Sequence, residues 1–337
     1  MDSKNSRAWL GKALGVLGPF AVLLALIVVL RIAVGESYFS AYNLRAVPLQ
    51  ATIVAISAIG MTMIIVAGGI DLSVGSVIAL CGVSAALVLR SDPNASALAI
   101  VAALVTGVVA GLVNGAIIAY GRMAPFIVTL GMMGVARGLA KWAGDKQTVD
   151  YDSSAWLNEL MRTTPDPRWM VVAPGVWLMV ILTVLMILFM RHAVFARRLY
   201  AIGSNEATAQ LCGIRVPSTK LLMYGLAGLF FGLSGALQTA RLTQGDPTAA
   251  VGLELDVIAA VVIGGASLSG GAGSVLGAVV GALIMTVLRN GTQQLGWESY
   301  TQEIIIGLVI VIAVALDRLR QSGLLSWERL SRLVRSQ

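Results

Sequence analysis

Ten apolar segments of the chain are close to the length that crosses a lipid bilayer. A membrane-spanning helix needs roughly 17–25 predominantly apolar residues. The segments lie at about 14–34, 46–66, 74–89, 96–120, 124–140, 171–190, 221–243, 253–266, 273–289 and 301–316. Because 57% of the residues are hydrophobic and only 12% are charged, a single soluble core could not bury this much apolar surface. We therefore expect an all-α integral membrane protein with about ten transmembrane helices, including broken or re-entrant segments.

The distribution of basic residues predicts the orientation in the membrane. Residues 191–220 carry five Lys or Arg against one acid, and residues 317–337 carry five against two, whereas residues 141–170 carry four against five. Cytoplasmic loops are enriched in Lys and Arg. We expect both termini in the cytoplasm: an N-terminus at 1–13, a transmembrane domain at 14–316, and a basic tail at 317–337. Within the domain, 141–170 is an external loop and 191–220 a cytoplasmic loop.

Composition excludes several classes of site and partner. The net charge of +7 follows the membrane topology, so the expected partner of the basic residues is the lipid bilayer and not nucleic acid. Two cysteines and one histidine leave almost no ligands for a structural metal, and we expect none.

A carboxylate interrupts the apolar sequence in "VAGGIDLSVGSV", residues 66–77. Carboxylates within a membrane are costly and usually functional. A second interpretation is structural, since Asp71 or Ser73 could cap a helix and glycines could end the helix before it. Either way, the stretch indicates a break between two membrane segments. Its candidate residues for a helix break or a translocation pathway are Gly68, Gly69, Asp71, Ser73 and Gly75.

A similar stretch, "GGASLSGGAGSV", occurs at 264–275. Internal repeats around broken helices are common in transporters, but chance similarity in a chain rich in small residues is an open alternative. The corresponding candidate residues are Gly264, Gly265, Ser267 and Ser269.

The acidic and nucleophilic residues do not predict an enzyme. An intramembrane aspartyl protease needs two carboxylates that share a proton. Counting spans places Asp71 and Asp256 at opposite faces of the membrane, with Glu254 beside Asp256. A Ser269–His192 dyad is also disfavoured, because His192 lies at a cytoplasmic helix end. Asn114 and Asn290 are better explained by hydrogen bonds between helices.

The cytoplasmic loop contains a short predicted helix in "RRLYAIGSNEATAQLCGI". Ser204 or Asn205 could be the N-cap, Glu206 lies in the first turn, and Gly213 is a good stop. We expect a helix at about 205–212 and a docked partner as one role for it; a solvated linker is the plainer alternative. The sequence has no phosphate-binding G-x-x-x-x-G-K-[ST] motif. Any dependence on ATP must therefore come from another polypeptide.

Three motifs in order, "GMTMIIVAGGIDLSVGSV", "YAIGSNEATAQLCGI" and "GLELDVIAAVVIGGASLSGGAGSVLGAVVGALI", resemble the ribose-type permease subunits of bacterial ABC monosaccharide importers. The similarity runs from about residue 45 to 316. It implies a multi-pass inner-membrane subunit that works by alternating access, without an ATPase site of its own.

The same resemblance implies three partners: a cytoplasmic ABC ATPase that binds ATP and Mg, a periplasmic sugar-binding protein, and a second permease subunit, either a copy or a paralogue. It also places the stretch from Gly68 to Gly75 near the pathway. The loop then becomes the helix that couples to the ATPase. Its residues are Gly203, Ser204, Asn205, Glu206, Ala207 and Gly213.

We therefore expect a permease that moves a small sugar, without bound cofactors of its own. The identity of the sugar stays open. The alternative is an ion-coupled secondary transporter in which Asp71 or Glu303 binds a proton or sodium ion. Glu303 could instead pair with Arg137, or each could extend separately to the membrane surface.

Overall fold

The computed structural model describes residues 3–321, and nearly all of its regular structure is helical. The twelve α-helices of this part are α1 (Ser3–Val34), α2 (Ala41–Val66), α3 (Val74–Ser91), α4 (Ser96–Tyr120), α5 (Pro125–Ala143), α6 (Pro174–His192), α7 (Val194–Ser204), α8 (Glu206–Leu211), α9 (Val216–Leu242), α10 (Leu253–Ile263), α11 (Val275–Gln294) and α12 (Ser299–Gln321). The 3-10 helices are η1 (Glu36–Phe39), η2 (Trp156–Met161) and η3 (Arg168–Met170), and the strands are β1 (Val149–Asp150) and β2 (Gln244–Gly245). The predicted all-α class is confirmed.

Each of the ten apolar segments coincides with one helix, and α7 and α8 form the loop between the sixth and seventh. Among the described residues, seven helices are long and apolar enough to cross a membrane alone: α1, α2, α3, α4, α6, α9 and α11. Helix α10 has only 11 residues. At 1.5 Å per residue it reaches roughly half of a 30 Å hydrocarbon core. It is therefore one of the partial spans that the sequence predicts.

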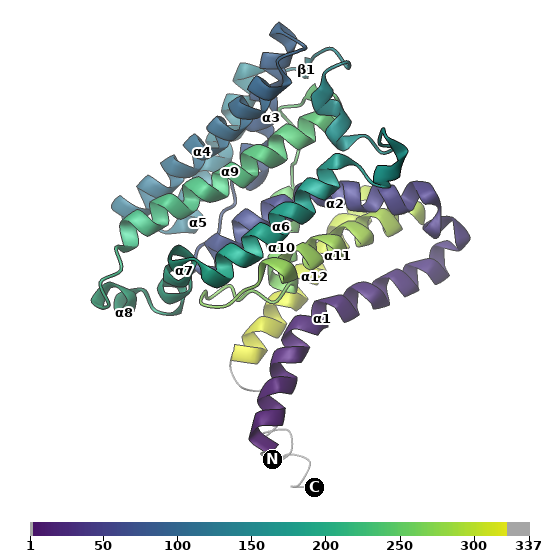
Figure 1. Ribbon diagram of the computed structural model, residues 1–337. Helices are drawn as coiled ribbons and strands as arrows, with labels where there is room; N and C mark the ends of the chain where they lie inside the picture. Colours follow the sequence, from purple (N-terminus) through teal and green to yellow (C-terminus); the bar gives the residue numbers. More distant parts are fainter. Residues whose placement is uncertain (1–2, 322–337) are drawn as a thin grey trace.

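Helix α8 and the start of α1 lie in the lower part of the view, and β1 lies at its top (Figure 1). The basic loop 191–220 carries α8, so the charge pattern predicts that this lower face is cytoplasmic and that β1 is external. Residues 1–2 and most of the predicted basic tail, 322–337, lie outside the described residues.

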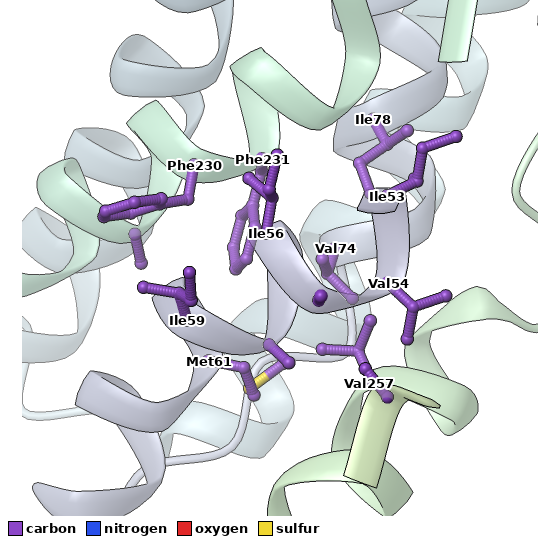
Figure 2. Packing of buried hydrophobic residues seen from close by; sticks show 14 of the residues in the cluster. Ile53, Val54, Ile56, Ile59, Met61, Val74, Ile78, Phe230, Phe231 and Val257 are labelled. Carbon is purple, nitrogen blue, oxygen red and sulfur yellow. The ribbon is translucent and has the colours of Figure 1, made fainter. Parts of the chain in front are cut away.

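Helix α2 forms the centre of the bundle because it is apolar on every side. Ile56 and Ile59 lie beside Phe231 and Phe230 of α9, whereas Val54 lies toward Val257 of α10 (Figure 2). Within the 18-residue apolar window of α2, 94% of the residues are buried. A helix enclosed in this way can move only together with its neighbours.

Helices α4 and α9 approach each other backbone to backbone. A Cβ atom added at Gly107 would overlap the carbonyl oxygen of Gly228 and lie 2.8 Å from the Cα atom of Gly232. In lipid, such contact between small residues drives helix association, because the hydrophobic effect does not distinguish one apolar neighbour from another.

Helices α3 and α10 both begin inside the bundle. The hydroxyl of Ser73, directly before α3, accepts a hydrogen bond of 3.1 Å from Asn114 Nδ2, more than one turn before α4 ends. Gly75 lies against the Ala250 carbonyl oxygen and Glu254 Oε2. The segment between α9 and α10 therefore re-enters the membrane and meets the start of α3.

Two further contacts hold this re-entrant segment on its external side. Strand β1 of the external loop pairs antiparallel with β2, with Val149 opposite Gly245. The Arg137 guanidinium on α5 donates to the carbonyl oxygens of Pro247 and Ala249, both at 2.7 Å. Arg137 thus binds backbone and not Glu303.

The external loop also packs onto the end of α9. The Tyr151 hydroxyl lies 2.6 Å from Asn158 Oδ1 and 3.0 Å from the Thr239 carbonyl oxygen. Burial raises the pKa of Tyr151 to about 12, so the hydroxyl keeps its proton at neutral pH.

We predict that Gly107→Val separates α4 from α9 and lowers both the yield and the melting temperature of the detergent-purified protein, because the new side chain meets backbone and not a flexible side chain. The control is Gly134→Val on α5, where a Cβ would meet nothing within 4 Å. Thermal unfolding monitored by size-exclusion chromatography gives the comparison. Equal melting temperatures would contradict the close-packing argument.

Candidate functional site

The predicted cytoplasmic helix is present as α8, directly after α7. The Asn205 side chain accepts a hydrogen bond of 2.9 Å from the Thr208 backbone N–H, which makes Asn205 the N-cap. Glu206 lies in the first turn and pairs with Lys220 Nζ at 2.8 Å. Gly213, with a φ of +82°, ends the helix. The local sequence therefore determines where α8 begins and ends.

Helix α8 presents most of its surface to solvent. Only Ala209 is buried, in a small cluster with Ile202 and Val216. Leu211 is 88% exposed, and Ala207 is exposed as well. The exposed face of α8 is therefore accessible to a partner from solution.

A hollow of about 840 Å³ lies beside α8, between it and the turn from α4 to α5. Its charged lining comprises Arg122, Arg215, Lys220 and Glu206. The hollow beside α8 is therefore lined by three basic side chains and one acidic side chain.

The end of α7 contacts both of the glycine-containing stretches that separate membrane segments, 66–77 and 264–275, at one place. Gly271 N–H donates to the Val66 carbonyl oxygen over 2.8 Å. A Cβ at Gly203 would overlap that same oxygen and lie 2.6 Å from Gly271 N, and one at Gly270 would lie 3.0 Å from the Cα atom of Gly68. We call this contact of Val66, Gly68, Gly203, Gly270 and Gly271 the glycine junction.

A further bond holds α7 to the same place. The Tyr200 hydroxyl donates to the Gly273 carbonyl oxygen over 2.9 Å. Ser204, the last residue of α7, lies beside Gly271. The structure thereby joins α7 to the end of α2 and to the loop between α10 and α11.

The two similar stretches share one way of ending a helix. Gly68 N bonds to Ile65 O and Gly69 N to Ile64 O, and in the second copy Gly265 N bonds to Val262 O and Ala266 N to Val261 O. Gly68 and Gly265 both have positive φ, +81° and +92°. This is a Schellman cap. When the two stretches are aligned by these backbone bonds, Gly68 corresponds to Gly265. The alignment by sequence letters instead pairs Gly68 with Gly264, one position earlier.

Beyond the shared cap, the two stretches differ from each other. Asp71 Oδ1 accepts hydrogen bonds from the Ser73 backbone N–H (2.8 Å) and hydroxyl (2.6 Å), so the carboxylate closes an Asx turn directly before α3. Both residues are buried. In the second stretch Gly264 packs on Gly277, and the Ser267 and Ser269 hydroxyls lie 2.8 Å apart. Asp71 bonds to the N-cap residue Ser73 and not to the first turn of α3, which has no side-chain cap bond. Its role in lining the pathway stays a prediction.

The remaining candidate residues each have a different bonding partner. Asp256 pairs with Arg289 of α11 at 2.8 Å. Asp71 instead bonds to Ser73. Because the two aspartates have different partners, the protease interpretation stays disfavoured; their placement at opposite faces of the membrane stays a prediction. His192 Nδ1 lies 3.0 Å from the Leu188 carbonyl oxygen, away from Ser269, and Glu303 is exposed on α12.

Sequence reasoning missed Arg289 and Tyr200. An arginine inside the apolar segment 273–289 was itself a signal, because charged residues in spans are usually paired or functional. The bond of Tyr200 to Gly273 had no such signal, since it joins residues far apart in the chain.

The chain matches a protein family described as "Branched-chain amino acid transport system / permease component" over residues 43–314. It is 40% identical to the ribose import permease protein RbsC of Escherichia coli K12, over 89% of this chain and 93% of the relative. It is 38% identical to RbsC of Bacillus subtilis 168, over 94% and 97%. It is 33% identical to the galactose/methyl galactoside import permease protein MglC of E. coli K12, over 90% and 94%.

No solved structure matches the chain. The relatives nevertheless cover nearly its whole length, and the seven long apolar helices agree with a multi-pass protein of the bacterial inner membrane. The chain therefore belongs to this family of transport-system permease components, whose members include the ribose import permeases.

Proposed function

We propose that this chain is the membrane subunit of an ATP-driven importer of a monosaccharide, and that α8 is its coupling helix. The observation that carries the proposal is the glycine junction. It attaches α7, which directly precedes the exposed and capped α8, to α2 and to the α10–α11 loop. A force applied to α8 from the cytoplasm is therefore transmitted to helices at the centre of the bundle.

The proposed partners follow from this arrangement. A cytoplasmic ABC ATPase, which binds ATP and Mg, docks on α8 and on the hollow beside it. A periplasmic binding protein delivers the sugar to the external loop, and a second permease subunit completes the pathway. ATP hydrolysis in the partner supplies the energy.

The mechanism we propose is alternating access. Closure of the ATPase moves α8 and α7. Because the backbones of α7 and α2 are in close contact at Gly203, the movement of α7 displaces α2 as well. Because α2 is enclosed by α9, α10 and α11, its displacement carries these neighbours with it. The pathway then opens alternately to the two sides.

The names of the relatives support a sugar as the cargo. Ribose and galactose are named for relatives that are 33–40% identical, whereas the family description names branched-chain amino acids. Ribose and galactose are hydroxyl-rich and leucine-type side chains are not, so direct comparison of D-ribose, D-galactose and L-leucine uptake distinguishes these two cargo classes.

We predict that Leu211→Asp weakens the association with the ATPase by about tenfold or more, because a carboxylate replaces an apolar contact. Its exposure means that the fold is not disturbed. Leu211→Met, which keeps an apolar side chain, is the matched control. Co-purification of the ATPase with the tagged permease is the measurement, and full recovery with Leu211→Asp would refute docking on this helix.

We predict that Gly203→Ala reduces transport more than it reduces ATPase binding. The methyl group forces α7 away from Val66, while α8 keeps its exposed surface. Gly134→Ala on α5 is the control, since a Cβ atom there would meet nothing within 4 Å. Uptake into proteoliposomes and co-purification are measured together. Unchanged uptake with Gly203→Ala would show that the junction does not transmit the motion.

We predict that Asp71→Asn keeps uptake close to wild type, because the amide oxygen can still accept both bonds from Ser73, whereas Asp71→Ala loses these hydrogen bonds and lowers stability by about 1 kcal/mol. An ion-coupled carrier would behave differently: it needs the charge of Asp71 or of the exposed Glu303. Uptake with and without a protonophore is the measurement. Loss of uptake in folded Asp71→Asn, together with sensitivity to the protonophore, would favour the carrier.

A further inference from the structure

A polar hollow of about 200 Å³ lies between α2, α9, α10 and α11, separate from the glycine junction. One water occupies about 30 Å³ in the liquid, so the hollow has room for several waters or one small polyol. Its polar lining comprises Gln50, Gln238, Arg241, Asp256, Thr286, Arg289 and Gln293. We call it the α10 pocket.

Seven polar side chains around one hollow are unusual inside a chain that is 57% hydrophobic. Glutamine amides donate and accept hydrogen bonds, guanidinium groups donate, and a carboxylate accepts. A sugar hydroxyl both donates and accepts, so this mixture of groups is suited to a ring that carries several hydroxyls. The rest of the lining is apolar and comprises Ile53, Val54, Ala250, Val251 and Leu253, which can pack against the carbon atoms of a sugar ring.

The ion pair in the wall has donor capacity left over. Arg289 Nη2 binds both carboxylate oxygens of Asp256, at 2.8 and 3.0 Å. Asp256 is buried, whereas the Arg289 side chain is 37% exposed. A guanidinium group has five N–H donors. Arg289 can thus hold Asp256 with one nitrogen and present others to the hollow.

The position of the pocket relates it to the re-entrant segment. Ala250, Val251 and Leu253 form part of its wall, directly at the start of the partial span α10. Irregular backbone at membrane depth is tolerated where it is buried in protein or lines a water-filled cavity. Discontinuous helices of this kind commonly form substrate sites in transporters.

The pocket is also mechanically connected to the junction. Three of the four helices that line it, α2, α10 and α11, meet at the ends that lie toward α8: Val66 ends α2, and Gly270 and Gly271 belong to the loop between α10 and α11. A movement of α8 that displaces these ends therefore changes the walls of the pocket.

We propose that the α10 pocket is a weak polyol-binding site of the permease itself, at which Gln50, Gln238 and the Asp256–Arg289 pair contact the hydroxyl groups of the transported sugar. This inference rests on the proposed function as a sugar importer. It goes further in assigning this chain a substrate site of its own, where selection by the binding protein alone would need none.

The test uses the purified full-length permease in detergent and saturation-transfer NMR, which detects millimolar affinities, with D-ribose, D-galactose and L-leucine as probes. The double variant Gln50→Leu/Gln238→Leu leaves the ion pair in place. Its polyol affinity should fall by about tenfold, because two neutral hydrogen bonds are lost. Gln294→Leu, one residue beyond Gln293 and outside the pocket lining, is the control and should bind like wild type.

Asp256→Asn is a second, independent variant that keeps the size of the side chain. In monodisperse protein it should also weaken polyol binding, since Arg289 loses its charged partner. The proposal is overturned if wild type binds neither sugar, if both variants bind like wild type, or if L-leucine binds in place of the sugars.

Co-purification of the ATPase is measured on the same variants and separates the two proposals. Loss of sugar binding with normal ATPase association supports the pocket within an intact importer. No sugar binding by wild type, with ATPase association that still depends on Leu211, would remove the pocket and leave the proposed function in place.

Discussion

A helix that ends within a membrane protein leaves carbonyl groups that water cannot reach, and each of them needs a partner. Helix α2 ends in this situation at Val66. Its carbonyl oxygen accepts a bond from Gly271 N–H, and Gly203 is close enough that any side chain there would displace it. The requirement to satisfy one oxygen thus brings together three segments that are distant in the sequence. The proposed transmission from α8 to the bundle depends on this contact.

Much of the fold could be predicted from local patterns in the sequence. The ten apolar segments coincide with ten helices, and α8 has the predicted cap at Asn205 and stop at Gly213. These features depend on neighbouring residues alone: hydrophobic length, an N-cap side chain and a glycine with positive φ. The similarity between "GGIDLS" and "GGASLS" also has a local cause, since both stretches end a helix with the same pair of backbone bonds.

Features that depend on tertiary contact could not be predicted in this way. Counting spans treats each apolar segment as a full crossing, but α10 is partial and the segment before it re-enters the bundle, so Glu254 meets Gly75. Arg137 bonds to the carbonyls of Pro247 and Ala249, and Arg289 pairs with Asp256. In each case the residue type suggested a buried partner, and only the fold determined which one. Gly68 and Gly203 belong to motifs that can be recognised in the sequence, but no local pattern indicated that they meet each other or that Gly270 and Gly271 join them.

The connection between the junction and the α10 pocket has a thermodynamic consequence. If docking at α8 changes the shape of the pocket, then a ligand in the pocket must change the affinity of α8 for its partner by the same factor. A site of high affinity would oppose the movement, because a sugar held tightly in one state stabilises that state against the next. Weak binding of the kind proposed for the α10 pocket stabilises no single state strongly. It would still change the affinity of α8 for its partner. A permease that receives its cargo from a binding protein therefore gains more from a weak site coupled to α8 than from a strong site that is not.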